Sequence, residues 1–279
     1  MRSIDLHTHT FCSDGTLSPR ALLVHAVDQG VEMLALTDHD TTEGLAEARQ
    51  AAHELGVTLI PGVEISVTWG TRTIHIVGLN INPDHDALQA GLAALRVTRS
   101  RRAVEIGERL AKQGIDHALA GAQGLARGSI VSRTHFARHL VDAGHVRDIQ
   151  QAFKKFLAHG GPGFARAQWA GLDQAVRWIV DAGGAAVIAH PGRYKLGTGK
   201  LKTLFAEFAG CGGHAIEVIS GSQHPQETPR FARLAREFDL AVSLGSDYHG
   251  PEQHWLQLGR LPALPEGSRP VWEHWLPHE

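Results

Sequence analysis

Two histidines near the start of the chain have the spacing of metal ligands. The run Ile4-Asp5-Leu6-His7-Thr8-His9 places apolar residues at alternate positions, which predicts a short buried strand that ends in a loop. Residues two apart on a strand point to the same side, so His7 and His9 present two imidazoles to one point. Asp14 adds a carboxylate in the loop that follows. Histidines two apart are also found on half-buried strands without a metal, so this stretch alone leaves both interpretations open.

Length and composition limit the class of protein. The chain has 279 residues, of which 43% are hydrophobic and 20% charged, so it can bury a full core. One α/β barrel of about 250 residues with an insertion fits this length, and so do two domains. The formal net charge of -2 argues against a broadly basic nucleic-acid surface. Nineteen histidines against two cysteines, Cys12 and Cys211, favour nitrogen and oxygen ligands over thiolates.

The chain shows no pattern of membrane insertion. No apolar run approaches the roughly 18 residues of a membrane-spanning helix, and the first residues lack the charged-then-apolar order of a signal peptide. We therefore expect a cytoplasmic protein without membrane contact, and no obligate protein partner is evident.

Strands and helices alternate in the first part of the chain. Ser18, Pro19 and Gly30 have the positions of the start and stop of a helix over 18 to 29. Apolar runs and the glycines that bound them predict further elements, namely strands at 32 to 37, 58 to 65 and 73 to 79, with a helix at 42 to 55 and a hairpin between the last two strands.

The middle of the chain interrupts this alternation. Residues 84 to 183 contain no convincing strand, and their periodicity predicts helices at 86 to 112, 133 to 143, 146 to 158 and 171 to 182. Apolar strands return at 184 to 189, 215 to 219 and 240 to 244, which gives seven strands in all. We interpret the middle as a helical insertion together with barrel helices.

Chemistry-bearing side chains recur where these strands end. A single histidine at such a position is usually a core or surface residue, but here six histidines and three carboxylates recur. In an α/β barrel the carboxyl ends of the strands share one face, where active sites lie. The residues expected to converge there are His7, His9, Asp14, His39, Glu64, His75, His190, Asp247 and His249.

Four motifs among these residues resemble those of a known family. They are Asp5-Leu6-His7-Thr8-His9, Thr37-Asp38-His39-Asp40, Ala189-His190-Pro191 and Ser246-Asp247-Tyr248-His249, and they resemble the motifs of the polymerase-and-histidinol-phosphatase (PHP) family of metal-dependent phosphoesterases. The resemblance implies the α/β class and a distorted seven-stranded, TIM-like (β/α) barrel with a helical insertion. The expected division is 1–95 and 169–279 for the barrel and 96–168 for the insertion.

The resemblance also implies a cluster of three divalent metal ions. Mn²⁺ is the expected metal, and Zn²⁺ and Fe²⁺ suit the same ligand types. Glu64 is expected to bridge two of the ions. The implied ligand sets are His7, His9, Glu64 and Asp247 for the first ion, Glu64, His75 and His190 for the second, and Asp14, His39 and His249 for the third.

The charge of such a cluster indicates its chemistry. Three divalent cations exceed the charge of Asp14, Glu64 and Asp247 by about three units, so the site favours an anion. Paired metals activate water and stabilise in-line displacement at phosphorus, which predicts phosphate-ester hydrolysis without a covalent intermediate. The residues expected at the catalytic centre are His7, His9, Glu64, His190, Asp247 and His249.

Four further residues are candidates for substrate contacts. Arg193 and Lys195 follow His190 in a loop at the same end of the barrel, and solvation is the alternative role for such loop cations. Arg133 and His135, in the insertion, resemble an arginine-x-histidine-phenylalanine-alanine segment of one PHP branch. They are expected to hold a phosphate that lies beyond the metals, and a capped, solvated helix end is the alternative.

That branch suggests the activity. Its members remove the 3′-phosphate of nucleoside 3′,5′-bisphosphates to give 5′-nucleotides, and they act as 5′-to-3′ exonucleases on short RNA. A nucleotide and short RNA are therefore the expected substrates. Histidinol-phosphate phosphatase or another small phosphomonoesterase is the alternative within the family. A polymerase-linked module needs a longer chain, and an amidohydrolase needs a bridging lysine where this sequence has Glu64.

Other charged residues are given supporting roles. Asp5, Asp38 and Asp40 flank the histidines and are expected to accept ring N–H groups, with N-capping of a helix as the alternative for Asp40. A basic run of Arg96, Arg99, Arg101 and Arg102 is expected to be an exposed helix face.

Overall fold

The strands form one sheet that curls into a barrel. The computed structural model describes residues 3–275 except 222, 254 and 274. Within this part of the chain, seven strands lie in sequence order across the sheet. The barrel nearly closes, since the Leu6 amide donates to the Leu244 carbonyl at 3.2 Å and Thr8 forms a bridge with Tyr248. The strands are β1 Ile4–Asp5, β2 Met33–Leu36, β3 Thr58–Trp69, β4 Arg72–Leu79, β5 Ala185–Ile188, β6 Ala215–Ser220 and β7 Ala241–Gly245.

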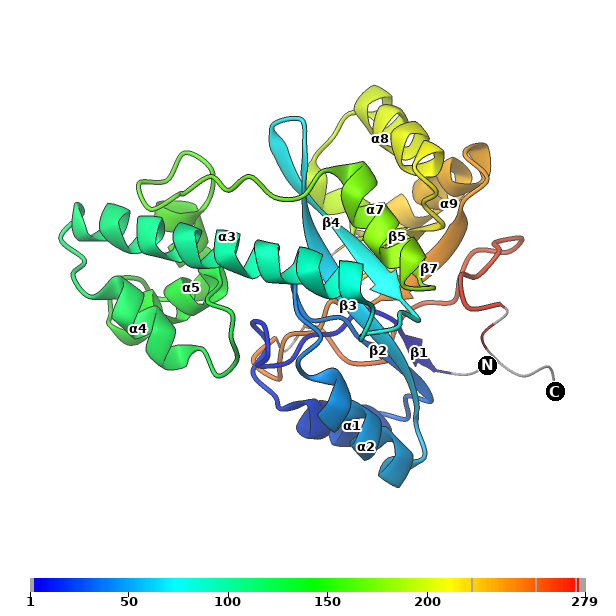
Figure 1. The fold of residues 1–279 in the computed structure, drawn as a ribbon, viewed down its shortest axis with the longest axis horizontal. Coiled ribbons are helices and arrows are strands. Elements are labelled where there is room, and N and C mark those ends of the chain that lie inside the picture. Colours follow the sequence, from blue (N-terminus) through cyan, green and yellow to red (C-terminus); the bar gives the residue numbers. More distant parts are fainter. Residues whose placement is uncertain (1–2, 222, 254, 274, 276–279) are drawn as a thin grey trace.

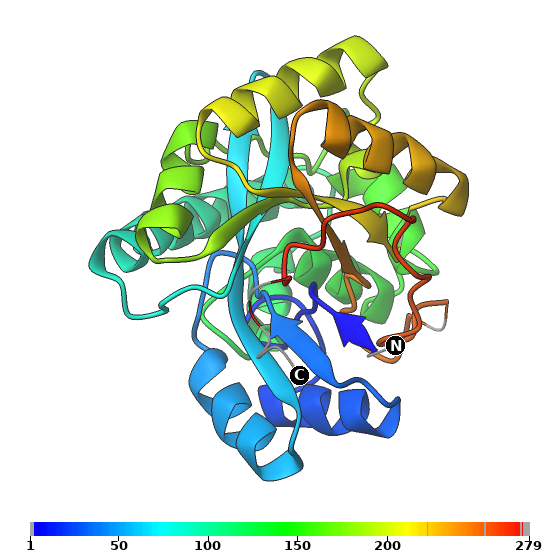
Figure 2. The same cartoon turned by 90° about the vertical axis from the view of Figure 1, so that its right-hand side faces the viewer.

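Two groups of helices surround the sheet. The first covers the outside of the barrel, as Figure 2 shows, and comprises α1 Pro19–Asp28, α2 Leu45–Leu55, α7 Leu172–Asp181, α8 Thr198–Gly210 and α9 Thr228–Glu237. Two short turns, η2 Pro191–Tyr194 and η3 Pro225–Glu227, lie in loops that follow β5 and β6. The second group of helices projects from one side of the barrel (Figure 1) and comprises α3 Asp86–Ala111, α4 Ala118–Leu125, α5 Arg133–Asp142, α6 Ile149–Ala152 and the π-helical turn η1 Phe153–Leu157. None of the described helices is long and apolar enough to cross a membrane.

The β3–β4 hairpin makes the barrel irregular. Strands β3, β4 and β5 pair antiparallel, whereas the other neighbours pair parallel. Gly70 has a φ of 57° in the tight turn, a conformation that favours glycine. Ser66 pairs with His75 across the hairpin, so that Glu64, two residues before Ser66, faces the same side of the sheet as His75. The hairpin thereby points two predicted metal ligands into the barrel.

The insertion has a hydrophobic core of its own. Leu88, Leu92 and Leu95 on α3 join the barrel core, whereas Ile106 and Leu110 further along the same helix join a second cluster. All buried members of this second cluster lie between residues 103 and 165. The two cores support the proposed division at 96 and 168. Helix α3 runs through the first boundary without a break.

The sequence predicted most of these elements. All seven strands and the hairpin are confirmed, and no strand interrupts residues 84 to 183, all of which the structure describes. The helix expected at 42 to 55 begins only at Leu45, since residues 43 and 44 form a turn that precedes it. The prediction of one regular helix over 146 to 158 was wrong. The helix is four residues of α6 continued by the π-helical turn.

A buried ion pair ties α3 to the barrel. The Arg99 guanidinium donates from Nε to Asp40 Oδ2 at 2.6 Å and from Nη2 to Ser66 Oγ at 2.9 Å. Asp40 Oδ1 accepts from the Ser66 backbone amide at 2.7 Å. Both charged side chains are buried, so the contact joins the insertion to the loop after β2 and to strand β3.

Removing one partner of this pair should destabilise the protein. Arg99→Met leaves the buried carboxylate of Asp40 without its cation, and we expect a loss of about 3 kcal/mol in the free energy of unfolding. Urea denaturation followed by circular dichroism measures it. The double variant Asp40→Asn/Arg99→Met should recover part of the loss, since no buried charge is then left unpaired. A loss below about 1 kcal/mol for Arg99→Met would show that the pair does not anchor the insertion.

Candidate metal centre and active site

The nine predicted metal ligands surround one pocket at the mouth of the barrel. They arrive from strand ends and from the hairpin, as the parallel strands and the β3–β4 pairing require. Most are buried, while His39, His75 and His249 are partly exposed towards the pocket. The structure thus brings together His7, His9, Asp14, His39, Glu64, His75, His190, Asp247 and His249.

Glu64 lies at the centre of the cluster. Its Oε1 is 2.9 Å from His75 Nδ1 and 3.1 Å from His190 Nε2, and its Oε2 is 2.8 Å from His39 Nδ1. His7 and His9 each bring Nε2 to 3.4 Å of the same carboxylate. Burial alone raises the pKa of Glu64, but the surrounding imidazoles hold the pKa well below its usual value. The carboxylate is therefore ionised, and each of its two oxygens lies close to imidazole nitrogens.

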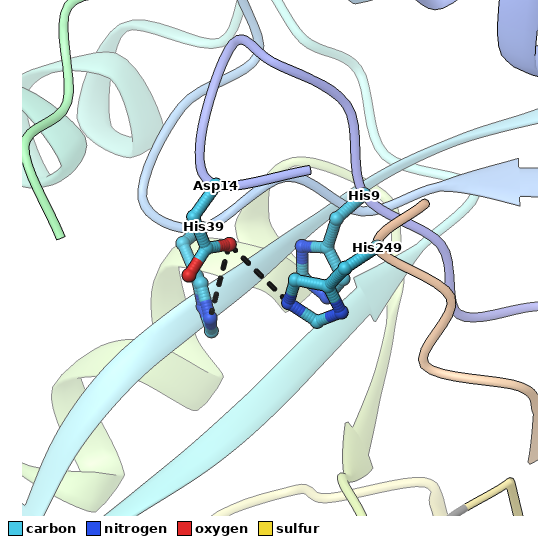
Figure 3. Close-up of side chains that lie close together, drawn as sticks. All are labelled: His9, Asp14, His39 and His249. Carbon is cyan, nitrogen blue, oxygen red and sulfur yellow. Dashed lines mark ion pairs between the residues drawn. The ribbon is translucent and has the colours of Figure 1, made fainter. Parts of the chain in front are cut away.

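Asp14 forms a second arm of the cluster, drawn in Figure 3. Its Oδ1 lies 3.3 Å from His249 Nε2 and 4.0 Å from His39 Nε2. The His9 ring stacks on the His249 ring with centroids 4.2 Å apart, which brings a third imidazole alongside. Thr134 of the insertion donates to Asp14 Oδ2 at 2.9 Å. The insertion thus holds a carboxylate of the cluster in place.

The donor atoms of this cluster fit divalent metal ions. Buried polar atoms normally have hydrogen-bond partners. Several imidazole nitrogens and carboxylate oxygens of this cluster have no hydrogen bond, although they lie close to one another. Imidazole nitrogen and carboxylate oxygen are the donors that divalent transition metals prefer. The buried atoms without a hydrogen bond include His7 Nε2, His9 Nε2, Asp14 Oδ1, His39 Nδ1 and Glu64 Oε2.

The ligand atoms fall into four overlapping groups. The atoms within each group lie within 4.8 Å of one another. These groups differ in part from the expected ligand sets, because His190 groups with His7 and His75 groups with His39. The division of the ligands among three ions remains a prediction. The groups are His9, Asp14, His39 and His249; His7, Glu64 and His190; His7, His9 and Asp247; and His39, Glu64 and His75.

Glu217, a buried glutamate on β6, belongs to the site but was not predicted from the sequence. Its Oε1 lies 3.0 Å from His7 Nδ1, and its Oε2 accepts from the His190 backbone amide at 2.6 Å. A carboxylate on one ring nitrogen orients the imidazole and leaves the other nitrogen, here His7 Nε2, for a metal. The signal was available, because Glu217 lies within the apolar run Ala-Ile-Glu-Val-Ile and an acidic residue in a buried strand requires a partner.

Loss of Glu217 should weaken metal binding without removing a ligand. We expect Glu217→Ala to lower the metal affinity about 10- to 100-fold, because His7 loses the group that orients its ring. Titration of the metal-depleted protein with Mn²⁺, followed by calorimetry, measures this directly. Glu217→Gln keeps one acceptor oxygen and should lose less affinity than Glu217→Ala. Unchanged affinity in Glu217→Ala would contradict the orienting role.

The three aspartates that flank the histidines do not bind histidine rings. Asp38 accepts hydrogen bonds from the Thr10 amide and hydroxyl and from Ser13, at 2.6 to 2.8 Å. Burial raises the pKa of Asp38 to about 6. Asp5 accepts from the Ser246 amide at 2.8 Å. Asp40 pairs with Arg99 as described above, and it does not cap α2. Both expectations for these aspartates were wrong, since their carboxylates shape the loops that carry the ligands.

A cavity of about 280 Å³, the metal cavity, opens beside the ligands. Arg99, Arg102, Arg133 and Arg193 all line it. Arg193 forms an ion pair with Asp247. Arg133 lies over the Phe153 ring at 5.6 Å and has no hydrogen bond or ion pair within the described part of the chain. The cavity therefore combines a candidate metal centre with guanidinium groups, two of which, those of Arg102 and Arg133, have no ion pair within the described part of the chain.

The other predicted substrate contacts lie elsewhere. His135 is buried, and its Nδ1 accepts from the Ser132 amide at 3.0 Å in a capping box at the start of α5. Lys195 is exposed and is not among the residues that line the metal cavity. The expected exposed basic face on α3 was wrong for two residues. Arg99 and Arg102 continue the inward stripe of Leu88, Leu92 and Leu95, a periodicity that could have identified them.

The fold and the site define a class of protein. An α/β barrel that gathers six imidazoles and three carboxylates at one mouth, with a guanidinium-lined cavity beside them, is a metal-dependent hydrolase of anionic substrates. The model of the PHP domain matches residues 5–165. The chain belongs to the PHP family of metal-dependent phosphoesterases.

Several relatives match over nearly their full length. A 3′,5′-nucleoside bisphosphate phosphatase of Chromobacterium violaceum is 46% identical over 98% of this chain and 96% of its own. The 5′-3′ exoribonuclease Rnm of Escherichia coli is 48% identical over 97% of this chain and 93% of its own. A solved structure from C. violaceum, described as an amidohydrolase with bound sulfate and no metal, superposes with a TM-score of 0.93 at 46% identity and covers 97% of this chain and 94% of its own.

Proposed function

We propose that this protein removes the 3′-phosphate of nucleoside 3′,5′-bisphosphates to give 5′-nucleotides and phosphate. One observation carries the proposal: the metal cavity is lined both by candidate metal ligands and by the unpaired guanidinium of Arg133, together with Arg102. A bisphosphate presents two anionic groups on one nucleoside and can contact both sets of residues. The relatives named as a bisphosphate phosphatase and as exoribonucleases support the same substrate class.

Exonuclease action on short 5′-phosphorylated RNA is the same reaction. In RNA, as in the bisphosphate, an ester at the 3′ oxygen of a 5′-phosphorylated nucleotide is cut. The residues that hold the 5′-phosphate and the scissile ester therefore serve both substrates. The leaving group, the 3′ oxygen of the 5′-phosphorylated nucleotide, is the same, and the difference is that the phosphorus carries the rest of the RNA chain.

Three divalent ions, Mn²⁺ before Zn²⁺ or Fe²⁺, are the proposed cofactors. Bound at this cluster, they would supply activated water and neutralise the charge that develops on the leaving and phosphoryl oxygens. The chain positions the substrate around them. Arg193 lies against Asp247 and can hold the phosphoryl oxygens, while Arg102 and Arg133 hold the distal phosphate. Glu217 orients His7, and Thr134 orients Asp14.

A substrate panel tests the proposal. Purified protein loaded with Mn²⁺ should release phosphate from adenosine 3′,5′-bisphosphate with a kcat/KM at least about 100-fold above that for adenosine 3′-phosphate or histidinol phosphate, because the simpler esters lack the second charged contact. Equal turnover of simple monophosphates would favour the alternative, a histidinol-phosphate phosphatase or another small phosphomonoesterase.

An amidohydrolase reaction, suggested by the description of the C. violaceum structure, has less support. No lysine is among the residues that line the metal cavity, and Glu64, the expected bridging ligand, lies among the imidazoles. The cytoplasmic location and the absence of an obligate protein partner remain predictions from the sequence.

A further inference from the structure

A second cavity of about 410 Å³ adjoins the metal cavity. This outer cavity lies between the tip of the β3–β4 hairpin and the segment 158–168, which runs past the hairpin in Figure 1. The backbone of Thr68 is hydrogen-bonded to Ala170 at 2.9 Å, which fixes the segment against the hairpin. The residues that line both cavities are Thr73, Arg102, Arg133, Arg193 and Tyr194.

The outer cavity is strongly cationic. Arg72 and Arg166 line it in addition to the three shared arginines, and no carboxylate is among its lining residues. Arg72 donates to the Tyr194 carbonyl at 3.1 Å, so its charge is not neutralised. Arg166 is exposed and has no hydrogen bond, ion pair or ring contact within the described part of the chain. Within the residues that the structure describes, neither Arg72 nor Arg166 forms an ion pair.

Two aromatic rings lie along the same cavity. His159 and Phe164 line it with ring centroids 5.2 Å apart, and His159 is exposed. Proteins bind single-stranded nucleic acid by combining a cationic groove with rings on which bases stack. The outer cavity has both features, whereas a site for phosphate groups alone needs only the cations.

Arg193 connects the outer cavity to the reaction centre. Its guanidinium contacts Asp247 among the metal ligands, and the same residue lines both cavities. An RNA chain that continues beyond a phosphate held at the metal ligands can pass along Arg193 towards Arg72 and Arg166. Arg72 and Arg166 line the outer cavity only, whereas Arg102 and Arg133, assigned above to the 5′-phosphate, line both cavities.

We propose that the outer cavity binds the RNA chain beyond the scissile phosphate, with the next base at His159 and Phe164 and the next phosphate at Arg166. This inference rests on the proposed function, and it assigns to the segment 158–168 and the hairpin a role in handling RNA that small bisphosphates do not need. Arg166 and His159 become specificity residues for chain length.

Three substrates and three variants test the inference. We compare kcat/KM for adenosine 3′,5′-bisphosphate, a 5′-phosphorylated trinucleotide, and adenosine 3′-phosphate 5′-triphosphate. Arg166→Ala should lower the value for the trinucleotide about ten-fold, because one charged contact to phosphate is lost, and should leave the bisphosphate within about two-fold. Arg166→Lys should keep part of the trinucleotide activity. Arg233→Ala, which removes an exposed charge on α9 outside both cavities, is the matched control and should change neither.

His159→Ala tests the stacking platform separately. It should lower the trinucleotide value about five-fold and leave the bisphosphate unchanged, since base stacking adds about 1 kcal/mol or more per base. Equal losses on both substrates, or no loss on either, would overturn the inference. A loss confined to the 5′-triphosphate would show that the cavity holds 5′-phosphates and not the RNA chain. Failure of the wild type to hydrolyse the bisphosphate would instead reject the proposed function.

Discussion

Glu64→Gln should abolish nearly all activity while leaving the fold intact. The substitution keeps the size of a fully buried side chain but removes the charge and one of the two oxygen donors at the centre of five imidazoles. We expect kcat/KM for the bisphosphate to fall at least about 1,000-fold, or about 4 kcal/mol of transition-state stabilisation. We also expect the purified variant to contain fewer bound metal ions than the wild type.

Two measurements separate this effect from misfolding. Circular dichroism and thermal unfolding of the metal-depleted variant should match those of the metal-depleted wild type. Elemental analysis should show fewer bound ions per chain. Glu237→Gln, an exposed glutamate paired with Lys202 on the outside of the barrel, is the control and should change neither activity nor metal content. Retention of full metal content and activity within ten-fold in Glu64→Gln would contradict a bridging Glu64.

The metal cluster was predictable because its geometry follows from strand periodicity. His7 and His9 lie two apart on one side of an extended segment, and the ends of parallel strands meet at one face. The antiparallel hairpin places His75 beside Glu64 through the register Ser66 to His75. The positions at strand ends follow from backbone geometry, whereas the ligand sets came from the resemblance to the PHP family and the Ser66–His75 register from the structure.

The arginines that line the metal cavity were less predictable, because their positions depend on contacts between distant segments. Arg99 looked like part of an exposed run until Asp40 was found 59 residues away along the chain, at 2.6 Å. His135 looked like a phosphate ligand, yet its Nδ1 serves the backbone of Ser132. In both cases a local pattern allowed two roles, and tertiary packing decided between them. Helix α3 positions Arg99 and Arg102 only because its leucines pack on the barrel.

Arg133→Ala should separate the recognition of bisphosphates from the hydrolysis of phosphate esters. The guanidinium of Arg133 lines the metal cavity, lies over Phe153 and has no charged partner in the described chain, so substrate is the anion available to it. Its removal should lower kcat/KM for adenosine 3′,5′-bisphosphate about 100-fold, the upper range for a lost charge-assisted hydrogen bond.

Adenosine 3′-phosphate is the internal control for this variant. It lacks the 5′-phosphate, so its slower hydrolysis should change less than about three-fold in Arg133→Ala, because the metal ligands are untouched. Arg101→Ala, which removes an exposed charge from α3 outside the metal cavity, should affect neither substrate. An equal loss on both substrates would mean that Arg133 supports the metal centre and not the 5′-phosphate. Wild-type activity on both would exclude Arg133 from recognition of the 5′-phosphate and leave Arg102 as the candidate contact from the insertion.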